Sequence, residues 1–204
     1  MAERPHTTLL HAWHEAAAAT MGDFSGWSMP LWYPTGAVAE HRVVITHAGL
    51  FDTSDMDVLA VNGPGAFALL QLCFTRDLRQ CVGRSRDPLT PGRCVYGAFL
   101  NDFGDLIDDA ILYFMQPDEY VVAVNAGMGD TIVDHLSSHA RGAETRISCC
   151  RDNVGKIDLQ GPMSARILLN VLQEPESVLS GLEYFTFAGH FDGESQLARV
   201  RLLD

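Results

Sequence analysis

The chain has 204 residues, 47% of them hydrophobic, so it can bury a sizeable core in one large domain or two small ones. Its 14 Lys and Arg against 26 Asp and Glu give a net charge of -12, which argues against a binder of nucleic-acid phosphates, a function that depends on clustered cations. The N-terminal segment has no long apolar run, so we expect neither a secretory signal nor a membrane span, and a cytoplasmic protein.

Helical and extended patterns alternate through the first third of the chain. An Ala-rich stretch predicts a helix over residues 8–20. Residues 22–34 are rich in Gly, Pro and aromatic residues, which predicts an ordered loop. A second helix is predicted over residues 36–47, and residues 49–62 alternate apolar and polar side chains as a strand does.

Two adjacent carboxylates interrupt an apolar, strand-forming run further along. Residues 94–100 and 106–113 read as a hairpin around a short polar turn, and the second strand contains Asp108 and Asp109. Because side chains alternate faces along a strand, we expect these two acids to point in opposite directions and at least one to face a covered side. The alternative is that both lie at an exposed strand end.

The order strand, Gly-Pro turn, helix occurs twice, and this repeat sets the fold class. The two copies are residues 58–61, Gly63-Pro64 and 66–73, and residues 156–159, Gly161-Pro162 and 163–172. A strand over 119–125 and a helix over 129–140 lie between them. The sequence therefore predicts an α+β fold of antiparallel sheets flanked by helices, with pseudo-duplicated strand, Gly-Pro, helix units.

The cysteines and histidines predict neither a disulfide framework nor a metal site. The five cysteines are odd in number and include no C-x-x-C pair, and Cys149 and Cys150 read as thiols on alternate faces of a strand. The eight histidines do not cluster at the spacing of metal ligands. Three of them, His6, His11 and His14, fall in the N-terminal helical region, where we expect them to be solvated.

Several short motifs occur in the order and register of one enzyme family. They are FSGWSMPL at 24–31, EH at 40–41, AGLFDTSDM at 48–56, VNGPGA at 61–66, GRCVY at 92–96, NDFGDLIDDAIL at 101–112, VNA at 124–126 and LQGP at 159–162. Together they resemble the aminomethyltransferases, the T proteins of the glycine cleavage system.

The resemblance implies a fold, a reaction and a partner. Residues 1–204 would correspond to the N-terminal half of the folate-binding T-protein fold, with the C-terminal half and its small β-barrel absent from this chain. The family's enzymes are transferases that take an aminomethyl group from the lipoyl arm of the H protein. With tetrahydrofolate as acceptor they form 5,10-methylenetetrahydrofolate and release ammonia.

The same resemblance assigns site residues by their place in the motifs. The family's catalytic aspartate falls on Asp109, and its folate contacts fall on Met56, Tyr96, Ile111 and Asn125. These residue types suit the chemistry, because an anion can orient reacting nitrogens and accept a proton, while apolar side chains cover the faces of a flat ring.

One departure from the family pattern leaves the substrate open. Asp55 stands next to Met56 where the family usually carries a histidine. The chain is therefore also compatible with another folate-dependent demethylase of the same superfamily, or with a non-catalytic folate-binding half-protein.

Overall fold

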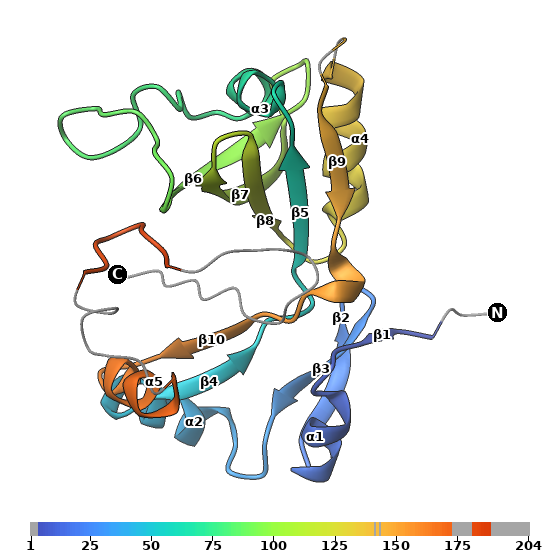
Figure 1. Ribbon diagram of the computed structural model, residues 1–204. Helices are drawn as coiled ribbons and strands as arrows, with labels where there is room; N and C mark the ends of the chain where they lie inside the picture. Colours follow the sequence, from blue (N-terminus) through green and yellow to red (C-terminus); the bar gives the residue numbers. More distant parts are fainter. Residues whose placement is uncertain (1–3, 141, 143, 173–180, 189–204) are drawn as a thin grey trace. The chain divides into compact units, whose positions relative to one another are not determined.

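The computed structural model describes residues 4–140, 142, 144–172 and 181–188 (Figure 1). The chain divides into two units. Unit 1 comprises residues 1–55 and 155–181, and unit 2 comprises residues 56–154 and 182–204. Each unit is therefore built from two separate stretches of chain.

In its described residues, unit 1 contains two small sheets and three helices. One sheet has the order β1-β3-β2, and β4 pairs with β10 in an antiparallel ladder. The short pairing of β1 with β3 is parallel. The elements are β1 (His6–Thr7), α1 (His11–Ala16), β2 (Thr20–Phe24), β3 (Trp27–Trp32), α2 (Ala37–Thr46), β4 (Gly49–Asp52), β10 (Ile157–Gln160) and α5 (Ser164–Leu172).

The loop predicted over residues 22–34 is wrong, because this stretch forms the β2–β3 hairpin. Ser25 and Gly26 both have positive φ and form the two-residue turn that matches the twist of paired strands. Trp27 and Met29 alternate inward and are buried, which holds β3 in place. The first helix is also shorter than predicted, since β2 already begins at Thr20.

Unit 2 is built on one antiparallel sheet with the strand order β6-β7-β8-β5-β9. The helices α3 and α4 contact each other, and α4 runs beside β9 and β5 (Figure 1). The elements are β5 (Asp57–Asn62), α3 (Ala66–Cys73), β6 (Arg93–Leu100), β7 (Leu106–Gln116), β8 (Glu119–Val124), α4 (Gly129–His139), β9 (Arg146–Cys149) and the 3₁₀ turn η1 (Arg151–Asn153). The predicted α+β class is confirmed.

Both predicted strand, Gly-Pro, helix units are present, one in each unit of the chain. β5 leads through Gly63 into α3, and β10 leads through Gly161 into α5. The two glycines have φ of +115° and +121°, a region that side chains with a Cβ rarely adopt. A Cβ on Gly63 would lie 2.0 Å from the carbonyl oxygen of Glu144, so the turn requires glycine.

The two faces of the unit 2 sheet bury different side chains. On one face, apolar residues of the strands pack with residues of α3 and α4, among them Leu70, Ile132 and Leu136, which are fully buried. Each such side chain contributes roughly 1.5 to 3 kcal/mol through removal from water. On the other face, Tyr113 and Val121 pack with Phe187. This second face also carries the candidate site.

A buried ion pair joins three elements of unit 2. Asp57, at the start of β5, is fully buried and accepts hydrogen bonds from Arg151 of η1, with Nη2 2.9 Å from Oδ2. The same oxygen accepts the backbone N–H of Gly129 at 2.7 Å, at the N-terminus of α4. Asp57 therefore anchors both η1 and α4 to the sheet.

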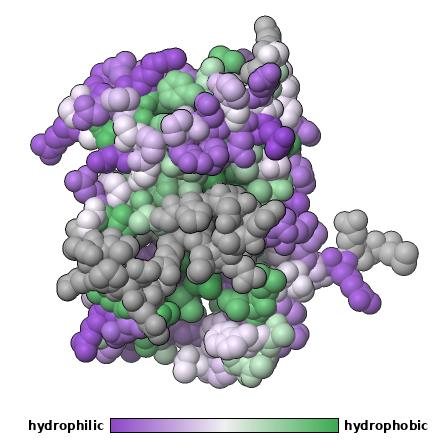
Figure 2. Space-filling view, viewed as in Figure 1, coloured by the Kyte–Doolittle hydropathy of each residue, from purple (hydrophilic) through white to green (hydrophobic). Residues whose placement is uncertain are grey.

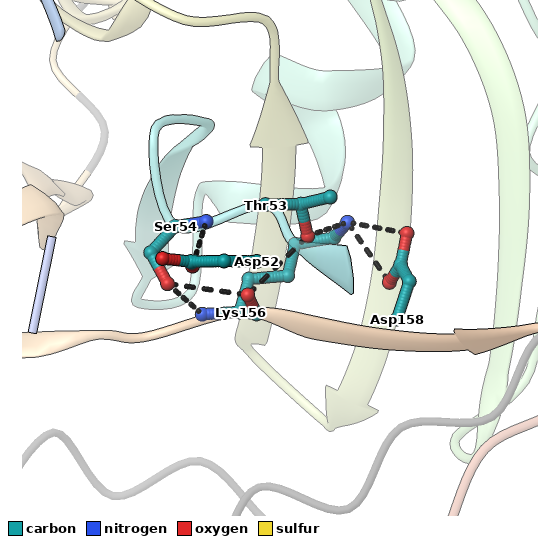
Figure 3. A network of polar contacts seen from close by, with 5 residues as sticks. All are labelled: Asp52, Thr53, Ser54, Lys156 and Asp158. Carbon is teal, nitrogen blue, oxygen red and sulfur yellow. Dashed lines mark hydrogen bonds and ion pairs between the residues drawn. The ribbon is translucent and has the colours of Figure 1, made fainter. Parts of the chain in front are cut away.

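A polar network links the two paired strands of unit 1 (Figure 3). Lys156 donates from Nζ to Thr53 Oγ1 at 2.9 Å and to Asp158 Oδ1 at 3.1 Å, and its backbone N–H donates to Ser54 Oγ at 3.0 Å. Asp52 accepts the backbone N–H of Ser54 at 3.1 Å. The network fixes the end of β4 against the start of β10.

His14 does not lie at the solvated position that the sequence predicts. Its side chain is 3% exposed, and Nε2 lies 3.0 Å from Asp52 Oδ2 while Nδ1 lies 2.8 Å from the Tyr33 hydroxyl. The sequence predicts a solvated His14, but Tyr33 and Asp52, which are distant in the chain, bind both of its ring nitrogens. A histidine with two polar partners can be buried at little cost.

Hydrophilic and hydrophobic residues are interspersed over the face shown in Figure 2. Among the described residues, none of the helices has the length and apolar content needed to cross a membrane.

Candidate functional site

The five site residues named by the sequence lie on one face of the unit 2 sheet. Tyr96 on β6 pairs with Ile111 on β7, and Asp109 is two residues before Ile111 on the same face. Extending the register by one pair beyond Asp57 and Val124 sets Met56 opposite Asn125, and Asn125 opposite Asp109. The strand pattern therefore gathers the five at neighbouring positions across four strands.

Asp109 is held by two hydrogen bonds from this set. The Tyr96 hydroxyl donates to Oδ2 at 2.8 Å, and Asn125 Nδ2 donates to Oδ1 at 2.9 Å. Asp109 is half-buried, whereas Tyr96 and Asn125 are exposed. Since a carboxylate has about four acceptor positions, roughly two stay available to a ligand. The acid is thus oriented by its neighbours and still accessible.

Asp108 points to the opposite face and is buried, as expected for one of the two acids. It accepts the backbone N–H of Asn125 at 2.9 Å through Oδ2 and the Asn125 side chain at 2.7 Å through Oδ1. Both amide hydrogens of Asn125 are therefore used by the two carboxylates. The group that Asn125 can offer a ligand is its carbonyl oxygen Oδ1, an acceptor.

Asp108 contacts the candidate site although the family motifs give it no role there. The alternation of β7 marks it as inward-facing, but only the fold shows that it positions Asn125. Neither Asp108 nor Asp109 forms an ion pair with a cationic side chain within the described ranges. The site therefore favours ligands with N–H donors or positive charge.

The Tyr96 hydroxyl stays a donor at neutral pH. Its hydrogen bond to Asp109, together with the negative charge of that residue, raises the pKa of Tyr96 above its usual value. A protonated phenol donates a hydrogen bond to the carboxylate of Asp109. It does not compete with Asp109 to accept a proton from a ligand. Asp109 is then the acceptor at the centre of the cluster.

Met56 and Ile111 supply apolar surface beside the polar cluster. Both are half-buried, and Ile111 packs against the cluster formed by Val58, Tyr113 and Val121. A thioether and an aliphatic side chain can cover the face of a flat ring without needing hydrogen-bond partners. This is the combination of apolar lining and few polar groups that ligand sites have.

A cavity of about 660 Å³ opens next to this cluster, at the edge of β6. Of the five named residues, Tyr96 is the one that lines it. Two arginines also line it: Arg93, whose Nη2 lies 2.7 Å from Glu183 Oε2, and Arg76, which donates to the Cys81 carbonyl at 3.3 Å. Its volume lies in the usual range for small-molecule sites.

Comparison with known proteins gives consistent matches. The family model described as GCVT N-terminal domain matches residues 10–202. An aminomethyltransferase from Streptomyces coelicolor is 35% identical over 178 residues, which cover 87% of this chain and 45% of the relative. One from Alcanivorax borkumensis is 35% identical over 197 residues, which cover 96% of this chain and 51% of the relative.

A solved structure shares the arrangement of the elements. The crystal structure of glycine cleavage system aminomethyltransferase T from Bartonella henselae superimposes with a TM-score of 0.76 at 31% identity. The match covers 88% of this chain and 46% of that one. The chain thus spans about half the length of the curated relatives that it matches.

Proposed function

We propose that this chain, which belongs to the GCVT N-terminal domain family, provides the folate-binding site and the catalytic aspartate of an aminomethyltransferase. The proposal rests on the hydrogen bonding and accessibility of the Asp109 carboxylate. It is oriented by Tyr96 and Asn125, lacks a cationic partner among the described residues, and has acceptor positions left for a ligand.

The residues at the site fit a reduced folate. Tetrahydrofolate, when bound, supplies the nucleophilic nitrogens that accept a one-carbon unit. Its flat ring presents apolar faces and N–H donors at the edge, which Met56 and Ile111 can cover and Asn125 Oδ1 can accept. Asp109, on the same face, would hold a reacting N–H at its free carboxylate positions.

The proposed donor is the aminomethyl group carried on the lipoyl sulfur of the H protein. In the reaction its C–S and C–N bonds break and two C–N bonds form, giving 5,10-methylenetetrahydrofolate. Two hydrogens of the acceptor end on the lipoyl sulfur and on the released ammonia, so the atoms balance. Positive charge develops on the nitrogens during the transfer, and an uncompensated carboxylate stabilises it.

Asp109 would act by orientation and by charge. Its two hydrogen bonds restrict the carboxylate to one position, so it does not need to reorganise when charge develops. It can accept a proton from a reacting nitrogen through whichever oxygen position faces the ligand. Tyr96 and Asn125 are positioning residues for this carboxylate, and Asp108 positions Asn125.

Binding and turnover of the full chain test the proposal. We expect calorimetry to detect tetrahydrofolate binding, and we expect aminomethylated H protein to yield methylenetetrahydrofolate and ammonia in equal amounts. Asp118→Asn is a matched control, because Asp118 lies in the turn at the opposite end of β7 and asparagine also tolerates its positive φ of 65°.

Other results of these experiments would favour one of the alternative functions. Binding without product would favour a non-catalytic folate-binding half-protein. Transfer of a methyl group from an N-, O- or S-methyl compound, without ammonia, would indicate a demethylase. Absence of tetrahydrofolate binding at millimolar concentration would contradict the proposal.

A further inference from the structure

Three metal-ligating side chains meet at the ends of α3 and α4, in unit 2. Cys73 is the last residue of α3, and His135 and His139 are one turn apart on α4. The Cys73 sulfur and one ring nitrogen of each histidine all lie within 4.8 Å of one another. The cluster is separate from the Asp109 site and plays no part in the proposed transfer.

The hydrogen bonds of His139 determine which of its nitrogens can bind a cation. Nδ1 lies 2.8 Å from the carbonyl oxygen of His135 and 3.0 Å from Ser138 Oγ, whose own hydrogen goes to the same carbonyl. Both neighbours are acceptors, so Nδ1 carries the hydrogen and Nε2 carries the lone pair. Histidine ligands of metals are commonly held in this way, with the second nitrogen donating to a backbone carbonyl.

His139 Nε2 faces Asp102 Oδ1 across 3.6 Å. The lone pair of a neutral ring and a carboxylate oxygen repel each other, and either a proton on Nε2 or a metal cation beside both atoms removes this repulsion. His135 contributes a second unsatisfied atom, because its Nε2 is buried and has no hydrogen-bond partner among the described residues. A buried polar atom without a partner destabilises the fold, and a bound cation would satisfy it.

We propose that Cys73, His135 and His139 bind a divalent transition metal of the zinc type, with Asp102 placed to become the fourth ligand. Thiolate and imidazole are the ligands that zinc prefers, and a carboxylate completes many such sites. In tetrahedral zinc coordination, ligand atoms lie roughly 3.3 to 3.6 Å apart. The three atoms, all within 4.8 Å of one another, would have to move closer together to reach this spacing.

A metal at this position would link three elements. Asp102 belongs to the turn between β6 and β7, and β7 carries Asp108 and Asp109. The metal would tie this turn to α3 and α4. A metal ion binds the thiolate form of cysteine, so binding at Cys73 would release the proton of its thiol.

Cobalt(II) substitution tests the site without any activity measurement. The untagged full chain, freed of metal by a chelator, is titrated with cobalt(II) and then with zinc(II). We expect one cobalt per chain, with the intense visible bands of tetrahedral coordination and a sulfur-to-cobalt charge-transfer band, and displacement by zinc.

Variants of the ligands show where the metal binds. We expect Cys73→Ser to abolish the charge-transfer band and His139→Gln to weaken binding by at least roughly 100-fold, more than loss of a partner that does not touch the metal. Cys150→Ser is the matched control and should bind as the parent does. Circular dichroism establishes whether each variant is folded. If Cys73→Ser does not fold, His139→Gln provides the test, because His139 lies at a partly exposed position.

Two results would overturn the proposal. One is the absence of the charge-transfer band in the parent chain, which would leave an ordinary contact between His139 and Asp102. The other is cobalt binding that is equal in the parent and in the folded variants, which would place the metal elsewhere.

Discussion

Asp108 and Asp109 show how two adjacent and identical side chains take different roles. The strand turns them to opposite faces, where they differ in burial and in hydrogen-bond partners. Asp108 is buried and accepts two hydrogen bonds from Asn125, whereas Asp109 is half-buried and accepts one from Asn125 and one from Tyr96. We therefore assign a structural role to Asp108 and propose the chemical role for Asp109.

These different roles predict that Asp→Asn substitutions at positions 108 and 109 lower the free energy of unfolding by different amounts. Asp108→Asn replaces an acceptor oxygen with an NH₂ group that faces a donor of Asn125, so we expect the free energy of unfolding to fall by about 1 to 3 kcal/mol. Asp109→Asn keeps contact with solvent and should cost less than about 1 kcal/mol. Urea denaturation of both variants measures the two values. Equal losses would contradict the division of roles.

The His14–Asp52 pair predicts how stability depends on pH. Burial alone would raise the pKa of Asp52, but hydrogen bonds from His14 and Ser54 outweigh it and the pKa is lowered. A carboxyl with a lowered pKa stabilises the fold above its unfolded pKa, near 4, and this stabilisation disappears as the pH falls through the folded value. We expect Asp52→Asn to be less stable than the parent at pH 7.

Denaturation at a series of pH values checks this expectation. The difference between the parent and Asp52→Asn should shrink as the pH falls below about 4. Asp23→Asn, at an exposed position in the same unit, should follow the parent throughout. A difference that does not change with pH would exclude the charge of Asp52 as its source.

Local sequence patterns predict most of the helices and strands. The hairpin of β6 and β7, the strand β8, the helices α2 and α4, and both Gly-Pro turns follow from periodicity and from turn residues. The sequence does not predict the β2–β3 hairpin, because the Gly and Pro residues of this segment are typical of a loop. Pairing between strands stabilises that segment, and composition does not show pairing.

The Gly-Pro turn after β5 predicts a sharp requirement for glycine. Gly63→Ala would place a Cβ 2.0 Å from the Glu144 carbonyl oxygen at a φ of +115°, so we expect a loss of about 2 kcal/mol or more in unfolding free energy. Gly104→Ala, at φ +87° with no atom within 4 Å of the added Cβ, should cost about 1 kcal/mol. Thermal denaturation compares the two, and similar losses would argue against the close contact.

The ion pair that anchors β5, α4 and η1 predicts a larger effect. Asp57→Asn removes the charge that neutralises Arg151, so we expect a loss of about 3 to 5 kcal/mol. Asp130 also contacts Arg151, at 3.4 Å, but its side chain is 76% exposed. Asp130→Asn should therefore cost less than about 1 kcal/mol. If both variants lose the same amount in urea denaturation, Asp57 is not the anchor.

The family motifs, and not the local patterns, predicted the residues of the candidate site. Met56, Tyr96, Ile111 and Asn125 are ordinary residues of strands and turns, and only their register with the aminomethyltransferases singled them out. The family assignment is confirmed by the match over residues 10–202. The hydrogen bonds that join Tyr96, Asp109 and Asn125 required the fold, because they link three strands.

The cluster of Cys73, His135 and His139 could be predicted only in part from the sequence. The spacing of His135 and His139 is visible in the sequence as one turn of a predicted helix. The approach of Cys73, more than 60 residues earlier in the chain, depends on the contact between α3 and α4. Because tertiary packing brings Cys73 to the two histidines, its part in the cluster leaves no spacing pattern in the sequence.

The transfer rate of Asp109→Asn tests the central claim most directly. With saturating tetrahydrofolate and aminomethylated H protein, we expect kcat to fall by about 100- to 1,000-fold relative to the parent, because an oriented charge at the reacting centre is lost. The fold and the tetrahydrofolate affinity should change far less. Equal rates for the parent and Asp109→Asn would contradict the assignment of Asp109 as the catalytic residue.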